Sequence, residues 1–131
     1  MVASAVMIAG VFVYGTLKPG GRNYAVAERA GVVARLEACL HGFRLYGLEP
    51  EGYPAMVRGE GRVYGWVLTF RDITAALPLL DGLEGCHLNP PLYERVAVAW
   101  QAAQVWTYLY ARPERLVEPG ARPVEDGHWS A

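Results

Sequence analysis

Short apolar segments, separated by glycine and proline, run through most of this sequence and point to a fold built on a sheet. The chain has 15 glycines and 9 prolines in 131 residues, and these residues interrupt regular structure at short intervals. Within several of the segments apolar and polar residues alternate, which is typical of strands with one buried face. The pattern therefore predicts five or six short strands.

Details of the segments indicate how these strands are arranged. His41 and Gly42 interrupt an otherwise regular alternation, so a β-bulge is expected there. Pro54 cannot donate a hydrogen bond to a ladder and predicts a short edge strand. A polar turn at residues 101–104 separates two apolar segments and indicates an antiparallel hairpin. The strands are expected at residues 11–14, 34–48, 53–57, 63–70, 92–100 and 105–110.

Two segments have the periodicity of helices. Residues 22–30 predict a short helix. Residues 73–84 predict a better one, because apolar residues recur every three to four positions, Thr74 can cap the start and Gly85 can end it. Pro78 is tolerated only near a helix start, so the regular part is expected to begin after Thr74. Strands and helices together predict an α+β domain with a curved, partly closed sheet.

Composition narrows the class of partner. Hydrophobic residues make up 53% of the chain and charged residues 19%, which excludes disorder and predicts a single domain over residues 1–131 with a well-filled core. Twelve basic residues against thirteen acidic ones give a formal net charge of −1, which argues against nucleic acid and membrane surfaces as partners. A small molecule is therefore the expected partner. Residues 111–131, rich in proline and charge, are expected to form a tail.

The apolar N-terminal stretch is not expected to direct export. No basic residue precedes it, as one would in a signal peptide, and it is shorter than the roughly 20 apolar residues of a membrane-spanning helix. We interpret residues 1–10 as a leader before a buried strand, with Met1 or Met7 as the natural start. Cys39 and Cys86, the two cysteines, are expected to stay reduced, which indicates a cytoplasmic protein.

Glu84 is the candidate catalytic residue. At about 100° per residue it falls in one arc with Ile73, Leu77 and Leu80, so its carboxylate lies on the face that should be buried. Burial and the negative end of the helix dipole should both raise its pKa, which suits a general base near neutral pH. A second interpretation, favoured by the pattern alone, is a helix-end residue that reaches solvent or an arginine such as Arg95.

The loop after the first strand is the candidate ligand-binding segment. Gly15 allows close approach of the backbone, and the successive amides of Gly15, Thr16 and Leu17 are able to form a concavity that binds a carboxylate. The glycines lack the spacing and the Lys-Ser/Thr pair of a phosphate-binding loop, so a nucleotide is not expected. An ordinary tight turn that leads into a helix is an equally good interpretation of this segment.

The remaining candidates are weaker. The three histidines have no ligand spacing and the two cysteines form no CxxC pair, so neither a metal nor a cofactor is expected. Cys86 next to His87 suggests a thiol nucleophile, but adjacent side chains usually point apart, which favours an inert cysteine. Tyr108 and Tyr110 lie two positions apart on a strand, so they share a face on which they could line a cavity.

Several motifs, in this order and spacing, resemble the gamma-glutamylcyclotransferase family, in the branch that includes gamma-glutamylamine cyclotransferases and AIG2-like proteins. The first is Val-Phe-Val-Tyr-Gly-Thr-Leu-Lys at residues 11–18, which is similar to the family's strand and substrate loop. The second is Leu-Asp-Gly-Leu-Glu-Gly at residues 80–85, followed by Leu-Tyr-Glu-Arg at residues 92–95. Between them lie Tyr-Pro-Ala at residues 53–55 and Val-Tyr-Gly at residues 63–65.

The resemblance implies a small mixed, partly closed β-barrel with flanking helices and an enzyme that needs no cofactor. By this resemblance Glu84 is the base that takes a proton from the α-ammonium of a gamma-glutamyl group. The freed amine attacks the γ-carbonyl, 5-oxoproline forms, and an amine or amino acid leaves. Tyr14, Gly15, Thr16 and Leu17 would be the substrate loop, which brings the reacting atoms together.

The resemblance also assigns a substrate-binding role to Tyr110, although Tyr108 matches a cavity-facing tyrosine equally well. Cys86 stands where many members of the family have an aromatic residue, which changes the wall beside Glu84. Lys18, the only lysine, closes the loop motif and is expected to shape or cover the loop rather than to react.

Two other hypotheses remain from the sequence. A non-catalytic module would use the same cavity to bind a small carboxylate. A structural or interaction protein would hold Glu84 in a salt bridge and have no open cavity beside it. The leaving amine and the oligomeric state are left open.

Overall fold

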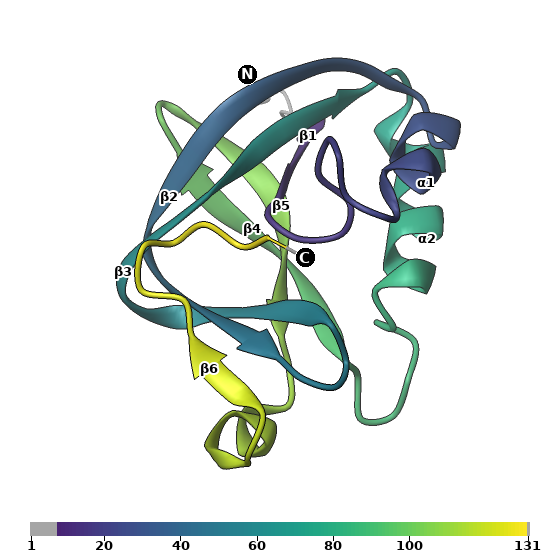
Figure 1. Cartoon of the computed structure of the whole chain (residues 1–131). Coiled ribbons are helices and arrows are strands. Elements are labelled where there is room, and N and C mark those ends of the chain that lie inside the picture. The colour runs from purple at the N-terminus through teal and green to yellow at the C-terminus, as the bar shows by residue number, and fades with distance from the viewer. Residues whose placement is uncertain (1–7, 131) are drawn as a thin grey trace, which may run out of the picture.

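The computed structural model describes residues 8–130, and in it six strands form one curled sheet (Figure 1). The strand order is β4-β5-β1-β3-β2-β6. Neighbouring strands are antiparallel except β1 and β5, which run parallel. The strands are β1 (Gly10–Val13), β2 (Val32–Leu48), β3 (Tyr53–Phe70), β4 (Tyr93–Trp100), β5 (Ala103–Tyr110) and β6 (Ala121–Pro123).

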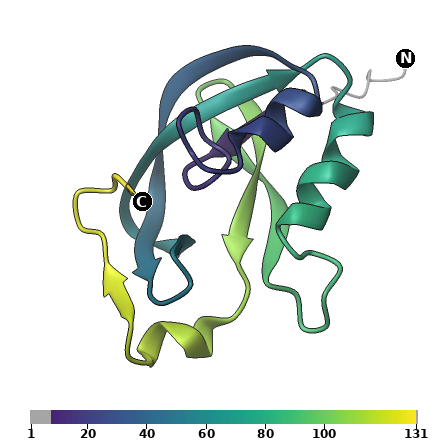
Figure 2. The ribbon, with the colours of Figure 1, turned by 45° about the vertical axis from the view of Figure 1, so that its right-hand side comes forward.

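Two α-helices, α1 (Tyr24–Arg29) and α2 (Ile73–Leu83), pack beside each other on the same side of this sheet (Figures 1 and 2). A 3-10 helix, η1 (Pro113–Val117), leads from β5 to β6. The curled sheet with its flanking helices confirms the expected α+β fold with a partly closed barrel. Residues 1–7 of the expected leader lie outside the described residues.

The long β2–β3 hairpin contains one confirmed and one wrong prediction. The register shifts between His41 and Phe43, so the bulge lies where the alternation of the sequence breaks. Residues 53–57, in contrast, are not a separate edge strand but the first part of β3. Because β1 pairs only with the far end of β3, Pro54 has a strand neighbour on the β2 side alone. A missing N–H is tolerated there as it is on an edge.

Helix α2 differs from the prediction at its start. Asp72, not Thr74, is the N-cap, and its side chain accepts a hydrogen bond of 3.3 Å from the amide of Ala75. The helix begins at Ile73 and continues through Pro78, so the prediction of a later start was wrong. Pro78 and Thr74 are both exposed, and water can therefore bind the carbonyl that the missing proline N–H leaves free. The expected end of the helix is confirmed, since Gly85 follows with a φ of +69°.

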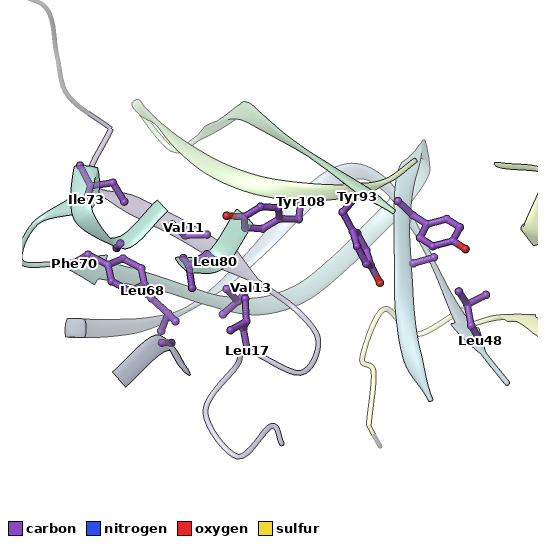
Figure 3. Close-up of a cluster of buried hydrophobic side chains, with 14 residues drawn as sticks. Val11, Val13, Leu17, Leu48, Leu68, Phe70, Ile73, Leu80, Tyr93 and Tyr108 are labelled. Carbon is purple, nitrogen blue, oxygen red and sulfur yellow. The ribbon is translucent and has the colours of Figure 1, made fainter. Parts of the chain in front are cut away.

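Strand β1 divides the core into two clusters because successive side chains of a strand point to opposite faces. Val11 and Val13 belong to a cluster that also includes Leu80 of α2, and Figure 3 shows Leu17 beside Val13 in this cluster. Phe12 and Tyr14 belong to the cluster on the other face of the sheet. The loop that follows β1 therefore starts from a strand that is buried on both faces.

The C-terminal part of the chain packs against the sheet. Strand β6 pairs with β2, and the side chain of Trp129 is buried in the cluster that contains Phe12 and Tyr14. The antiparallel β4–β5 hairpin is present as expected, with its turn at Gln101, whose φ is +54°. Among residues 8–130, no helix has the length and apolar character needed to cross a bilayer.

Two glycines provide a test of this packing. An added Cβ on Gly65 of β3 would lie 2.2 Å from the carbonyl oxygen of Val13, whereas on Gly82 of α2 it would meet nothing within 4 Å. We expect Gly65→Ala to lower the free energy of unfolding by about 1–3 kcal/mol through overpacking. Gly82→Ala should raise it by about 0.5–1 kcal/mol, because alanine favours a helix. Urea denaturation of both variants checks this, and an unchanged stability for Gly65→Ala would contradict the close contact of β1 and β3.

Candidate active site

A cavity of about 100 Å³ opens where the loop after β1 meets the end of α2. Its walls come from five parts of the chain. They are the loop at residues 13–17, the start of α1, the start of β3 around Pro54, the end of α2 at Glu84, and the β4–β5 hairpin with Tyr93 and Tyr108. Segments far apart in the sequence therefore build one small site.

Most of the site residues expected from the sequence line this cavity. The expected residues found in its lining are Tyr14, Gly15, Thr16, Leu17 and Glu84.

Tyr110 lies elsewhere. It is buried against Tyr93, with the two rings edge to face and 5.4 Å between their centroids. It is Tyr108, the alternative tyrosine on the same strand, that lines the cavity. The two side chains share one face of β5, but only the position of Tyr108 along the strand coincides with the cavity.

Hydrogen bonds fold the loop back on itself. The Lys18 amide donates to the Gly15 carbonyl at 3.2 Å, and the Gly21 amide donates to the Lys18 carbonyl at 2.7 Å. Asn23 then closes the loop, because its backbone amide donates to the Thr16 carbonyl at 2.9 Å and its side chain to the Thr16 hydroxyl at 3.0 Å. A Cβ on Gly21 would lie 2.3 Å from that carbonyl oxygen, so only glycine allows this closure.

Unused backbone donors are the main chemical feature of the loop. Within residues 8–130, the N–H groups of Gly15, Thr16 and Leu17 donate to no other group. Gly15 also packs tightly on Pro54, since a Cβ at this position would lie 2.7 Å from the proline Cγ. Successive free amides next to a cavity are suited to bind an anion such as a carboxylate.

Glu84 contributes the other chemical feature. It follows the last residue of α2, and its amide donates to the Leu80 carbonyl at 2.9 Å. In the described part of the chain, its carboxylate has neither an ion pair nor a hydrogen bond, and the side chain is half-buried with its oxygens accessible from the cavity. Burial therefore raises the pKa of Glu84 from an ordinary 4.5 to about 7.

Arg95 does not pair with Glu84, because Asp81 occupies it. The Nε atom of Arg95 lies 2.9 Å and 3.3 Å from the two Asp81 oxygens, and its guanidinium stacks 4.3 Å from the ring centroid of Trp106. The Tyr108 hydroxyl donates to the same carboxylate at 2.7 Å. Two carboxylates one turn apart thus have opposite environments, and only the one on Glu84 is free for a ligand.

The buried tyrosine hydroxyls connect the walls of the cavity. Tyr14 donates to the Tyr108 carbonyl at 2.7 Å, and Tyr93 donates to the Pro54 carbonyl at 2.5 Å. Burial also raises the pKa of both tyrosines above its ordinary value, so neither is a base near neutral pH. Glu84 is therefore the group in this cavity best suited to take up a proton.

Sequence reasoning missed several residues that line this cavity, among them Tyr93 and Arg22. Tyr93 falls within one of the motifs, at residues 92–95, but nothing in the sequence indicated that it lines the cavity. Arg22 lines the cavity as well, and its position depends on how the loop folds back, for which the sequence contains no signal.

The other candidates supply no further chemistry. Burial and the neighbouring carboxylates of Asp81 and Glu84 raise the pKa of Cys86 to about 11, so its thiol stays protonated and is a weak nucleophile. Among the residues that the structure describes, no three His, Cys, Asp or Glu side chains are grouped to hold a metal ion.

Most of the chain is similar to a known family and to a protein with a curated name. The model of the family "Gamma-glutamyl cyclotransferase, AIG2-like" matches residues 11–131. A protein of Vibrio cholerae serotype O1 with the curated name "Putative gamma-glutamylcyclotransferase" is 32% identical over 119 residues, which are 91% of this chain and 93% of that protein. Both matches cover most of the chain.

Solved structures show the same fold. The solution structure of protein ytfP from Escherichia coli is 29% identical, with a TM-score of 0.60 over 92% of this chain and 95% of that one. The crystal structure of c4763, a protein specific to uropathogenic E. coli, has a TM-score of 0.71 over 95% of this chain and 94% of that one. Its identity is 18%, so it is evidence for the fold alone.

The burial of Glu84 has a consequence for stability. Because its pKa is raised to about 7 in the folded state, the stability that this group contributes falls as the pH rises from about 4.5 to about 7. We expect Glu84→Gln to raise the Tm by about 3–6 °C at pH 8 and by clearly less at pH 5. Thermal unfolding followed by circular dichroism checks this. Glu94→Gln, at an exposed position of β4, is the matched control and should change little at either pH. An equal effect of Glu84→Gln at both pH values would contradict the raised pKa.

Proposed function

This chain belongs to the gamma-glutamyl cyclotransferase, AIG2-like family, and from that premise we propose that it converts a gamma-glutamyl amine or small gamma-glutamyl peptide to 5-oxoproline. One observation carries the proposal. A half-buried carboxylate without a partner among residues 8–130, that of Glu84, lines the same small cavity as the three loop residues whose amides are unused. The reaction needs both, one to move protons and the other to hold a carboxylate.

In the proposed complex the amides of Gly15, Thr16 and Leu17 bind the α-carboxylate of the substrate. The α-ammonium group then lies toward Glu84, since both groups line the cavity. The substrate's own positive charge stabilises the ionised form of Glu84 and compensates for part of its desolvation.

Glu84 acts as the general base. Its carboxylate takes one proton from the α-ammonium group, and the free amine attacks the γ-carbonyl carbon. A C–N bond closes the five-membered ring, and the C–N bond to the leaving amine breaks. Two of the three ammonium protons end on the leaving nitrogen, at least one of them through Glu84, which is ionised again at the end of the cycle.

The rate advantage comes mainly from orientation. The amine and the carbonyl belong to one flexible molecule, and binding of its carboxylate to the loop restricts the chain to conformations close to the ring. The loop is suited to this role because it is closed by its own hydrogen bonds and packed on Pro54. No cofactor takes part in the reaction as proposed.

A cytoplasmic location remains a prediction. Cys39 and Cys86 are both free thiols, as expected for a reducing compartment. Small gamma-glutamyl compounds are the proposed partners, and a role for nucleic acid or membranes is not proposed.

The base assignment is tested by substitution. We expect Glu84→Gln to lower kcat for 5-oxoproline formation by a factor of about 100 or more, because an amide cannot accept the proton. The measurement is chromatographic quantification of 5-oxoproline after incubation with a panel of gamma-glutamyl amines and peptides. Glu94→Gln removes a carboxylate at an exposed position of β4 and should retain wild-type activity.

Two outcomes would contradict this assignment. Full activity of Glu84→Gln would exclude Glu84 as the base. Calorimetric binding of the panel without any turnover by the wild-type protein would instead favour a module that binds small carboxylates.

The raised pKa predicts the pH dependence of the reaction. The base must be ionised, so kcat/KM should increase with pH and reach a plateau above about pH 7, in accordance with the pKa of Glu84 in the free protein. Initial rates between pH 5 and pH 9 check this. A rise centred at pH 4 to 5 would indicate a base with an ordinary carboxylate pKa and would argue against Glu84.

A further inference from the structure

A second cavity, of about 410 Å³, lies next to the proposed active site and shares Arg22 with it. Its walls come from the turn between β2 and β3, from β6 and from the C-terminal segment. In Figures 1 and 2 this segment runs beside the loop, and the Lys18 ammonium donates to the Trp129 carbonyl. The second cavity is therefore the neighbouring space into which a bound molecule can extend.

Arg22 is held at the boundary between the two cavities. Its backbone is fixed by the next residue, Asn23, which forms two hydrogen bonds with Thr16. Its guanidinium donates to the Gly52 carbonyl at 3.0 Å, across the gap between the loop and the β2–β3 turn. The long side chain of Arg22 is thus held at its backbone and at its guanidinium.

Most of the donors of Arg22 remain unused. A guanidinium has five N–H donors, and the contact with Gly52 uses one of them. In the described range, no carboxylate lies within ion-pair distance of this side chain. Arg22 is exposed and lines both cavities, so a ligand carboxylate can approach its planar fork.

The geometry points to a binding site for the leaving group, and we infer that Arg22 selects leaving groups that bear a carboxylate. This inference rests on the proposed function. If the gamma-glutamyl part fills the first cavity, whose volume is about 100 Å³, the leaving part must extend outward, where the second cavity begins at Arg22. An amino acid or short peptide as leaving group places its carboxylate within a few bonds of the reacting amide.

The charged side chains around the second cavity suit a leaving group with a single carboxylate. Besides Arg22 this cavity contains Arg122, which is exposed on β6, and two acidic residues, Glu49 and Asp126. Asp126 accepts a hydrogen bond of 3.0 Å from the backbone amide of His128 and is engaged locally. The two acidic residues disfavour leaving groups with several carboxylates, whereas a simple amine would leave the guanidinium without a partner.

A pair of substrates that differ only in this carboxylate gives the test. Gamma-glutamyl-alanine and gamma-glutamyl-ethylamide have the same scissile bond, and the second lacks only the carboxylate of the leaving group. We expect the wild type to prefer gamma-glutamyl-alanine in kcat/KM, mainly through KM. Arg22→Gln should reduce that preference by about tenfold, the effect of losing a charge-assisted hydrogen bond.

Two further variants separate recognition from structure. Arg22→Lys keeps the charge but not the fork, so it should recover part of the preference. Arg29→Gln removes an exposed arginine from α1 and should leave the ratio of the two kcat/KM values unchanged. A purely structural role of Arg22 would lower kcat/KM for both substrates alike and leave their ratio intact.

The outcomes distinguish this inference from the proposed function. Turnover of both substrates with a ratio that Arg22→Gln does not change would overturn the role of Arg22 and leave the cyclotransferase function intact. If the wild type forms no 5-oxoproline from either compound or from the panel of gamma-glutamyl amines and peptides, the proposed function fails, and calorimetry with the same pair then tests recognition. Tighter binding of gamma-glutamyl-alanine that Arg22→Gln abolishes would support the site, and equal or absent binding would overturn it.

Discussion

The site depends on the hydrogen bonds that the carboxylate of Asp81 accepts. This carboxylate accepts hydrogen bonds from Arg95 of β4 and Tyr108 of β5, so the last turn of α2 is attached to the β4–β5 hairpin. Glu84 lies one turn further along and is thereby held at the cavity. Because Asp81 occupies Arg95, Glu84 has no arginine partner and its pKa stays high. The same helix end thus provides one carboxylate held by hydrogen bonds and one that is free for a ligand.

A second set of hydrogen bonds makes the cavity rigid before any ligand binds. Tyr14 at the start of the loop is bound to the hairpin, Tyr93 of the hairpin is bound to β3, and Thr107 donates to the Phe12 carbonyl at 2.9 Å. Each bond satisfies a buried polar group and crosses between elements that are distant in sequence. The hydrogen bonds therefore join the walls to one another, and the groups left for a ligand include Glu84, the loop amides and Arg22.

Features that depend on local sequence were predictable, and features that depend on long-range pairing were not. The bulge at His41 and the end of α2 follow from period and turn chemistry, and the structure agrees with both. Helical periodicity placed Glu84 on the apolar face, but the pattern alone favoured a helix-end residue that reaches solvent or an arginine, and its place in the cavity wall required the fold. The unbroken course of β3 through Pro54 was missed, because it depends on where β1 pairs. Which of Tyr108 and Tyr110 lines the cavity, and where Arg22 lies, also depend on long-range packing. Neither could therefore be predicted from the sequence.

Lys18 shows how the loop is connected to the rest of the fold. Its ammonium donates to the carbonyl of Trp129 and lies 5.7 Å from the centroid of the same indole ring. The indole belongs to the core cluster that also contains Phe12 of β1 and Tyr14 at the start of the loop. The C-terminal segment therefore stabilises the loop from its far side, while Asn23 closes it from within. Lys18 directly follows the three residues with free amides, so the contact with Trp129 holds the end of the segment that bears these donors.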